Sequence, residues 1–82
     1  MSAIKLKITT PSKVVKEINA EWVIIPAKEG DMAVLPDKAP QIVQLRAGCV
    51  KISGVDENIL IKGGVADISL NTCTISTEAV EE

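Results

Sequence analysis

Ile4-Lys5-Leu6-Lys7-Ile8-Thr9 alternates aliphatic and polar residues along its whole length. Because successive side chains of a β-strand point to opposite faces, this pattern predicts a half-buried strand. Further strand-like runs follow, separated by turn residues. They are expected at residues 14–18, 20–25, 42–46, 49–53, 59–62, 65–70 and 73–77. A series of eight or more short strands with no sustained helical period predicts an all-β fold, either a sandwich or a flattened barrel.

Length and composition agree with this fold class. A chain of 82 residues is expected to form a single domain, residues 1–82. It contains one Trp and no Phe or Tyr, so the core must be built from aliphatic side chains, among which β-branched residues favour strands. At the C-terminus Thr77 could cap a helix, and residues 78–82 are therefore expected to be a helix start or a disordered tail.

Two glycine-containing positions predict interruptions. Ala47-Gly48 is expected to separate two strands, and Gly63-Gly64 is expected to let the chain bend or to let another backbone approach closely. Between residues 26 and 40, three prolines and a glycine punctuate a few apolar residues. This segment is interpreted as a stiff, shaped surface segment between two strand-like runs.

Charge and hydropathy exclude several classes of partner. The formal net charge is −2, the chain has no basic stripe, and aromatic residues are nearly absent, so nucleic-acid binding is not expected. The apolar run at residues 22–25 is far too short to span a bilayer. No signal-peptide pattern is present, and the chain is expected to be cytosolic, with a peripheral place beside a membrane left open.

The residues of catalytic and metal sites are missing. There is no His, no phosphate-binding glycine motif and no CxxC, so no catalytic, cofactor-binding or metal-binding residues are predicted. Cys49 and Cys73 are interpreted as small buried or half-buried thiols. The acidic pairs Glu29/Asp31 and Asp56/Glu57 are interpreted as solvated loop charges. The chain is therefore not expected to be an enzyme.

A binding role remains. Some aliphatic side chains could face outward and mark an interface, or a small sandwich could simply expose a few of them. The candidates are Val43, Cys49 and Val65. One reading of the chain is accordingly a free-standing β-sandwich module that binds a peptide or a small ligand at a sheet edge.

A series of motifs resembles one known family. Thr10-Pro11, the segment from Pro26 to Pro40, Gly48-Cys49-Val50-Lys51-Ile52 and Gly63-Gly64-Val65 occur in this order. They resemble the N-terminal domain of the epsilon subunit of F-type ATP synthases, which is called delta in mitochondria. Ala27, Ala33 and Asp37 replace family glycines, so the loop is expected to be tighter or differently bent. Lys38 replaces the usual His.

The resemblance implies a β-sandwich of about ten strands. It also implies a non-catalytic central-stalk (rotor) subunit of a proton-translocating ATP synthase, which couples the c ring to the gamma subunit and the catalytic head. The implied partners are gamma and the c ring, and the implied location is peripheral, at the cytoplasmic face of the inner (plasma) membrane, reached only through the ring. Family members usually continue into two C-terminal helices, whereas this sequence stops at Glu82, so either the natural protein is short or the sequence is part of a longer one, and the properties of those helices are not assigned to it.

Site residues follow from the same resemblance. The loop that should face the c ring consists of Glu29, Gly30 and Asp31. The residues that should lie near gamma, on one side of the domain, are Thr10, Lys38, Ala39, Pro40 and Val43. Pro36 and Pro40 would hold the segment in one shape and lower the cost of ordering it on binding.

Overall fold

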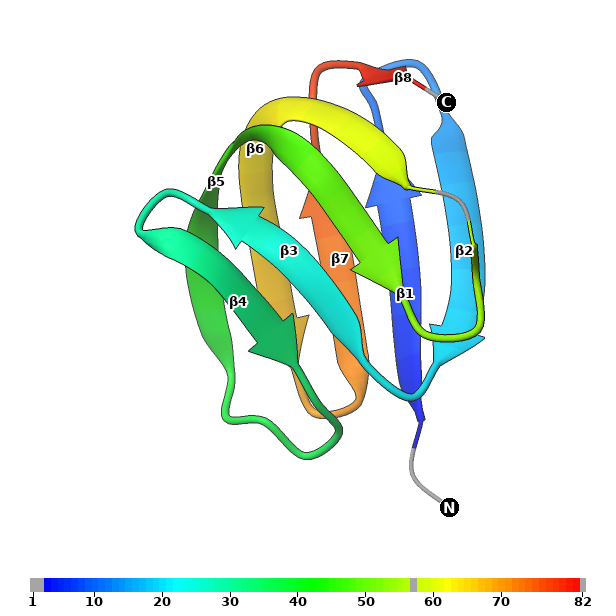
Figure 1. Cartoon of the computed structure of the whole chain (residues 1–82), viewed down its shortest axis with the longest axis vertical. Coiled ribbons are helices and arrows are strands. Elements are labelled where there is room, and N and C mark those ends of the chain that lie inside the picture. The colour runs from blue at the N-terminus through cyan, green and yellow to red at the C-terminus, as the bar shows by residue number, and fades with distance from the viewer. Residues whose placement is uncertain (1–2, 57, 82) are drawn as a thin grey trace.

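The computed structural model describes residues 3–56 and 58–81, and over these residues the chain forms eight β-strands (Figure 1). The strands are β1 (Ile4–Thr9), β2 (Val14–Ala20), β3 (Val23–Ala27), β4 (Gly30–Val34), β5 (Gln41–Ile52), β6 (Ile59–Ser69), β7 (Thr72–Ser76) and β8 (Val80–Glu81). The predicted all-β class is confirmed, whereas the count of about ten strands is not. Within the described ranges, no helix is long and apolar enough to cross a membrane.

The strands form one hydrogen-bonded path that folds over on itself. Their order is β2-β1-β7-β6-β5-β3-β4, with β8 attached to β6. The β1–β7 pair is parallel, and the other pairs are antiparallel. In Figure 1 the long strands β5 and β6 curve at the top of the molecule, which carries β3 and β4 in front of β6 and β7. The result is a flattened β-sandwich.

The strands β5 and β6 each run through a point where the sequence predicts an interruption. Gly48 lies within β5, where an added Cβ would come within 2.9 Å of the Cβ of Pro26 on β3. In β6, Gly63 and Gly64 have φ values of 87° and 125°, and pairing with β5 continues on both sides of them. These glycines therefore bend the strands or admit a neighbour without ending them, as the sequence predicted for Gly63-Gly64.

The segment between residues 26 and 40 is more regular than the sequence predicts. Its first two residues end β3, and residues 30–34 form β4, which pairs with β3 in an antiparallel hairpin. Val34 is buried while Asp31 and Ala33 are exposed, so the alternation of a strand is present but short. Residues 28–29 form the turn of this hairpin, and residues 35–40 form the loop that connects β4 to β5.

The core is aliphatic, as predicted from the composition. It is built from inward-facing residues of β1, β3, β5, β6 and β7 in particular, with Leu6, Ile8, Ile25 and Ile75 wholly buried. Trp22 stays at the surface with 39% of its area exposed. The only aromatic residue of the chain therefore does not help to fill the core.

The end of the chain requires a correction. The sequence predicts a helix start or a disordered tail over residues 78–82, but residues 80 and 81 form β8 and pair with Ile61 and Leu60 of β6. Thr77, the expected helix cap, instead donates its amide to the carbonyl of Thr9 at 3.0 Å. Residues 60 and 61 of β6 pair with the backbone of residues 80 and 81, whereas a helix of so few residues would not be stable. Residue 82 lies outside the described residues.

Candidate functional site

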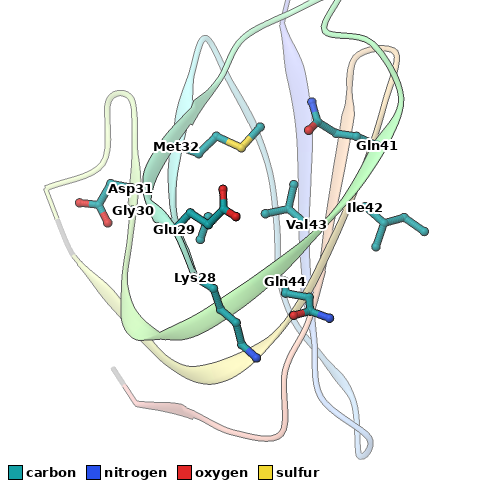
Figure 2. Close-up of a pocket in the computed structure, with 10 residues that line it drawn as sticks. Lys28, Glu29, Gly30, Asp31, Met32, Gln41, Ile42, Val43 and Gln44 are labelled. Carbon is teal, nitrogen blue, oxygen red and sulfur yellow. The ribbon is translucent and has the colours of Figure 1, made fainter.

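A groove of about 520 Å³ opens between β4 and the first residues of β5 (Figure 2). It is lined by residues 27–32, which comprise the β3–β4 turn and the start of β4, and by residues 41–44 of β5. The groove thus gathers the three residues expected at the c ring, Glu29, Gly30 and Asp31. It also includes Val43, which was expected at the gamma subunit.

The groove lies beyond the last pair between β3 and β5, which is Ala27 with Leu45. Ile24 pairs with Lys51, but the next pair is Ala27 with Leu45, so β5 bends away over the residues between. Before Leu45, residues 41–44 of β5 pair only with β6. The amide of Lys28 donates to the carbonyl of Gln44 at 2.9 Å, which ties the β3–β4 turn to β5 at one end of the groove.

The side chains give the groove an apolar floor and an acidic edge. Figure 2 shows Glu29, Met32 and Val43 directed into the groove, whereas Asp31 and Ile42 point away from it on opposite sides. Met32 and Val43 are partly buried and pack against the core. Glu29 is exposed, and in the described part of the chain it forms no ion pair.

Asp31 does have a partner within the chain. Its Oδ1 lies 2.6 Å from Nη2 of Arg46 on β5, and Nη1 of the same guanidinium donates to the carbonyl of Ala27. Both ionic side chains are partly exposed to solvent. No sequence pattern predicts this contact, because Asp31 on β4 and Arg46 on β5 lie on strands that do not pair with each other but are separated in the sheet by β3.

The residues expected at gamma do not form one cluster. The amide of Asp37, in the β4–β5 loop, donates to Oδ1 of Asn71 at 3.2 Å, and the carbonyl of Asn71 accepts from the amide of Lys5 at the start of β1. The loop that carries Lys38, Ala39 and Pro40 therefore lies near the start of β1. Thr10 follows the end of β1, roughly 17 Å away along the strand.

Ile42 is an exposed residue that the sequence analysis missed. It is 73% exposed, whereas Val43, the predicted contact residue, is partly buried. The signal lies in the two-residue period of β5, because Ile42 shares a face with Gln44 and Arg46 while Val43 shares the face of buried Leu45. Of the other proposed outward residues, Val65 is 40% exposed and Cys49 is half-buried.

The two cysteines differ in burial, since Cys49 is half-buried and Cys73 is buried. Both are free thiols, and burial, together with the nearby charge of Asp67, raises the pKa of Cys73 to about 11. A thiol with so high a pKa stays protonated at neutral pH and is unreactive. No cluster of three or more metal-binding side chains occurs among the described residues.

The fold and the groove together define a small all-β domain whose surface, rather than a reactive side chain, is available for function. Solved structures share this fold. A chain of the mitochondrial ATP synthase of Euglena gracilis, from a structure of OSCP/F1/c-ring, superposes with a TM-score of 0.88 at 23% identity, over 99% of this chain and 54% of that one. A chain of the Tetrahymena thermophila mitochondrial ATP synthase, from its central stalk/c-ring, gives a TM-score of 0.75 at 17% identity, over 96% and 66% of the two chains.

Sequence comparison assigns the family. The ATP synthase epsilon chain of Rickettsia typhi is 38% identical over 81 residues, which cover 93% of this chain and 74% of that protein. That of Gluconacetobacter diazotrophicus is 37% identical over 92% of this chain, but only 55% of the relative is covered. The family model for the ATP synthase delta/epsilon chain β-sandwich domain matches residues 3–82. The chain belongs to this family, and it spans little more than half the length of some of its relatives. The alternative of a free-standing binding module finds no support in these comparisons.

Proposed function

We propose that this chain is a non-catalytic subunit of the central stalk of an ion-translocating ATP synthase, where it connects the c ring to the gamma subunit. The observation that carries the proposal is the family match over residues 3–82. Relatives from several bacteria are named ATP synthase epsilon chains, and one from Propionigenium modestum is named sodium ion specific. The proposed location is peripheral, at the cytoplasmic face of the membrane, reached through the ring.

The proposed contact with the c ring is the β3–β4 turn with Glu29, Gly30 and Asp31. This turn is exposed and lies beside an edge strand, β4, so a partner can approach it without rearranging the sandwich. Its acidic character suits a partner with basic or amide groups. Such contacts fix orientation and register more than they add affinity.

The proposed contact with gamma centres on Ile42, next to the predicted Val43 and close in sequence to Lys38, Ala39 and Pro40. A single aliphatic side chain with 73% of its area exposed has no stabilising role in the isolated chain, and burial against a partner would remove it from water. Thr10 lies at the other end of β1. A gamma surface that includes it would have to extend along the length of the domain.

The test compares two substitutions of exposed aliphatic residues. Ile42→Glu is expected to abolish co-elution with purified gamma from the same source in gel filtration, because it places a charge in the proposed interface. Leu60→Glu is the matched control, since Leu60 is 44% exposed on β6 and lies outside the proposed surfaces. Co-elution of wild type and Leu60→Glu alone supports the proposal. If the wild-type chain never co-elutes with gamma at low or moderate salt, the proposed function is wrong.

A further inference from the structure

We propose that Arg46 forms an ion pair with Asp31 and hydrogen-bonds to both ends of the β3–β4 turn. Glu29 is then the acid of this turn that binds a basic side chain of the partner. The inference rests on the proposed function, because the partner is taken to be the c ring. It changes the expected roles of the turn residues. Asp31 becomes a positioning residue, and Glu29 becomes the contact residue.

The first step is the geometry of Arg46. Its guanidinium donates from Nη1 to the carbonyl of Ala27, the last residue of β3, and from Nη2 to Oδ1 of Asp31 at 2.6 Å, near the start of β4. The turn lies between these two acceptors. The planar, doubly donating guanidinium suits this role, because a lysine could not occupy both acceptors with the same fixed geometry.

The second step is the backbone of the turn. Gly30 has a φ of 135°, a conformation that residues with a Cβ rarely adopt, and the amide of Lys28 donates to the carbonyl of Gln44 at 2.9 Å. Arg46 and Gln44 are both on β5, so one strand fixes the turn from two points. A turn held in one shape before binding lowers the entropy cost of forming a complex.

The third step is the distribution of charge. Asp31 points away from the groove, and its charge is already paired with Arg46. Glu29 points into the groove. Figure 2 shows the side chain of Lys28 directed away from the carboxylate of Glu29. Among the described residues Glu29 has no ion pair, so its carboxylate is available for a group that enters the groove.

The fourth step is the chemistry of the occupant. Below the carboxylate of Glu29, Met32 and Val43 form a partly buried apolar floor within about 520 Å³ of open groove. A lysine or arginine combines an aliphatic stem with a charged end, and such side chains lay the stem on apolar surface while the charge stays at the rim. The groove therefore fits a long basic side chain from a loop of the ring.

A double-mutant cycle of Asp31 and Arg46, together with a single substitution of Glu29, distinguishes the roles of the two acids. Association of the full chain with the detergent-solubilised c ring from the same source is measured for Asp31→Asn, Arg46→Met, the double variant and Glu29→Gln. We expect Glu29→Gln to weaken association about fivefold, the size of one exposed charge pair, and to lose that effect at high salt. Asp31→Asn is expected to weaken association in the wild-type background and to have no further effect in the Arg46→Met background.

Asp56→Asn is the matched control, because Asp56 is an exposed loop acid that forms no ion pair within the described ranges. It should leave association unchanged. If Asp31→Asn weakens association equally in both backgrounds, or if Glu29→Gln behaves like Asp56→Asn, the assignment of roles is wrong.

A second measurement does not depend on the ring. Amide hydrogen exchange at residues 28–30 of the isolated chain should become faster in Asp31→Asn and Arg46→Met and stay unchanged in Glu29→Gln. The exchanged pair Asp31→Arg with Arg46→Asp should restore part of the protection. Unchanged exchange in Arg46→Met would show that Arg46 does not hold the two ends of the β3–β4 turn. A wild-type chain that fails to bind the ring overturns the proposed function and the role of Glu29 with it, while the exchange data still decide the role of Arg46.

Discussion

At the scale of single residues, unusual backbone conformations explain why certain side chains stand where they do. Asp37 replaces a family glycine, and the loop was therefore expected to be tighter or differently bent. In the structure Asp37 has a φ of 64° and Asn71, whose side chain accepts from its amide, has a φ of 59°. Asp and Asn tolerate this left-handed region better than other non-glycine residues. Asp37 thus occupies a conformation that glycine also favours.

Gly64 is the position where a side chain is least tolerable. An added Cβ would lie 2.0 Å from the carbonyl oxygen of Ser76 and 3.0 Å from the Cα of Thr77, and φ is 125°. Gly64→Ala is therefore expected to lower the free energy of unfolding by about 3 kcal/mol or more, because the backbones of β6 and β7 must separate. Urea unfolding followed by the fluorescence of Trp22 measures it.

The matched control for this substitution is Gly54→Ala. Gly54 also has a positive φ, 77°, but no atom lies within 4 Å of its added Cβ. Only the conformational cost remains, about 1–2 kcal/mol. Equal losses in the two variants would show that the close approach at Ser76 contributes nothing.

Cys73 makes the free energy of unfolding depend on pH in the alkaline range. Burial above all, and the charge of Asp67, raise its pKa from 9.0 to about 11, so the unfolded thiol loses its proton first. The stabilisation is complete below pH 9 and is lost as the pH rises toward 11, on the order of 2–3 kcal/mol. Unfolding by urea across this range should show a steeper decline for the wild type than for Cys73→Ala. Cys49→Ala, which leaves Cys73 in place, should decline like the wild type; equal slopes in all three would contradict the prediction.

At the scale of elements, alternation located the strands but not their continuity. The prediction of β1 was correct to the residue, because its alternating pattern is complete and Pro11 follows closely. In β5 the sequence predicts a separation at Ala47-Gly48, and in β6 it predicts a bend or a close approach at Gly63-Gly64, but pairing to neighbouring strands carries the backbone through both. β4 was missed because its five residues contain a glycine and only one buried side chain, so the pairing with β3 rather than its own pattern makes it a strand.

The β2–β3 turn shows how one side chain holds two elements together. Oγ of Ser53, which follows β5, accepts hydrogen bonds from the amides of Glu21 at 2.7 Å and Trp22 at 3.2 Å. Ser53→Ala is expected to cost about 1 kcal/mol, because water replaces only part of these bonds at an exposed site. Hydrogen exchange at these two amides should become faster, and the emission of Trp22 should shift.

Ser53→Thr keeps the hydroxyl and serves as the control. It should retain most of the protection at the two amides. Loss of protection in Ser53→Thr to the same degree as in Ser53→Ala would mean that the hydroxyl is not what holds the turn.

At the scale of the whole molecule, the curling of the sheet decides which residues meet. It brings Arg46 to Asp31, joins β1 to β7 in a parallel pair, and places Lys38 and Thr10 at opposite ends of β1. None of these relations follows from sequence spacing, since each depends on which strands the folded sheet places side by side. Lys38 and Thr10, both predicted to lie near gamma on one side of the domain, are thus separated by the length of β1, and their place at gamma stays a prediction.

The sequence by itself determined the all-β class, the aliphatic core, the absence of catalytic motifs and, through its motif series, the family. These properties depend on local alternation and on residue types, which tertiary structure does not alter. Only the tertiary structure decided that β5 and β6 are continuous, that residues 80–81 are a strand, and that, within the described residues, Asp31 forms an ion pair and Glu29 forms none. The physical reason is the same in each case: backbone groups and charges are satisfied by partners that only the folded sheet brings within reach.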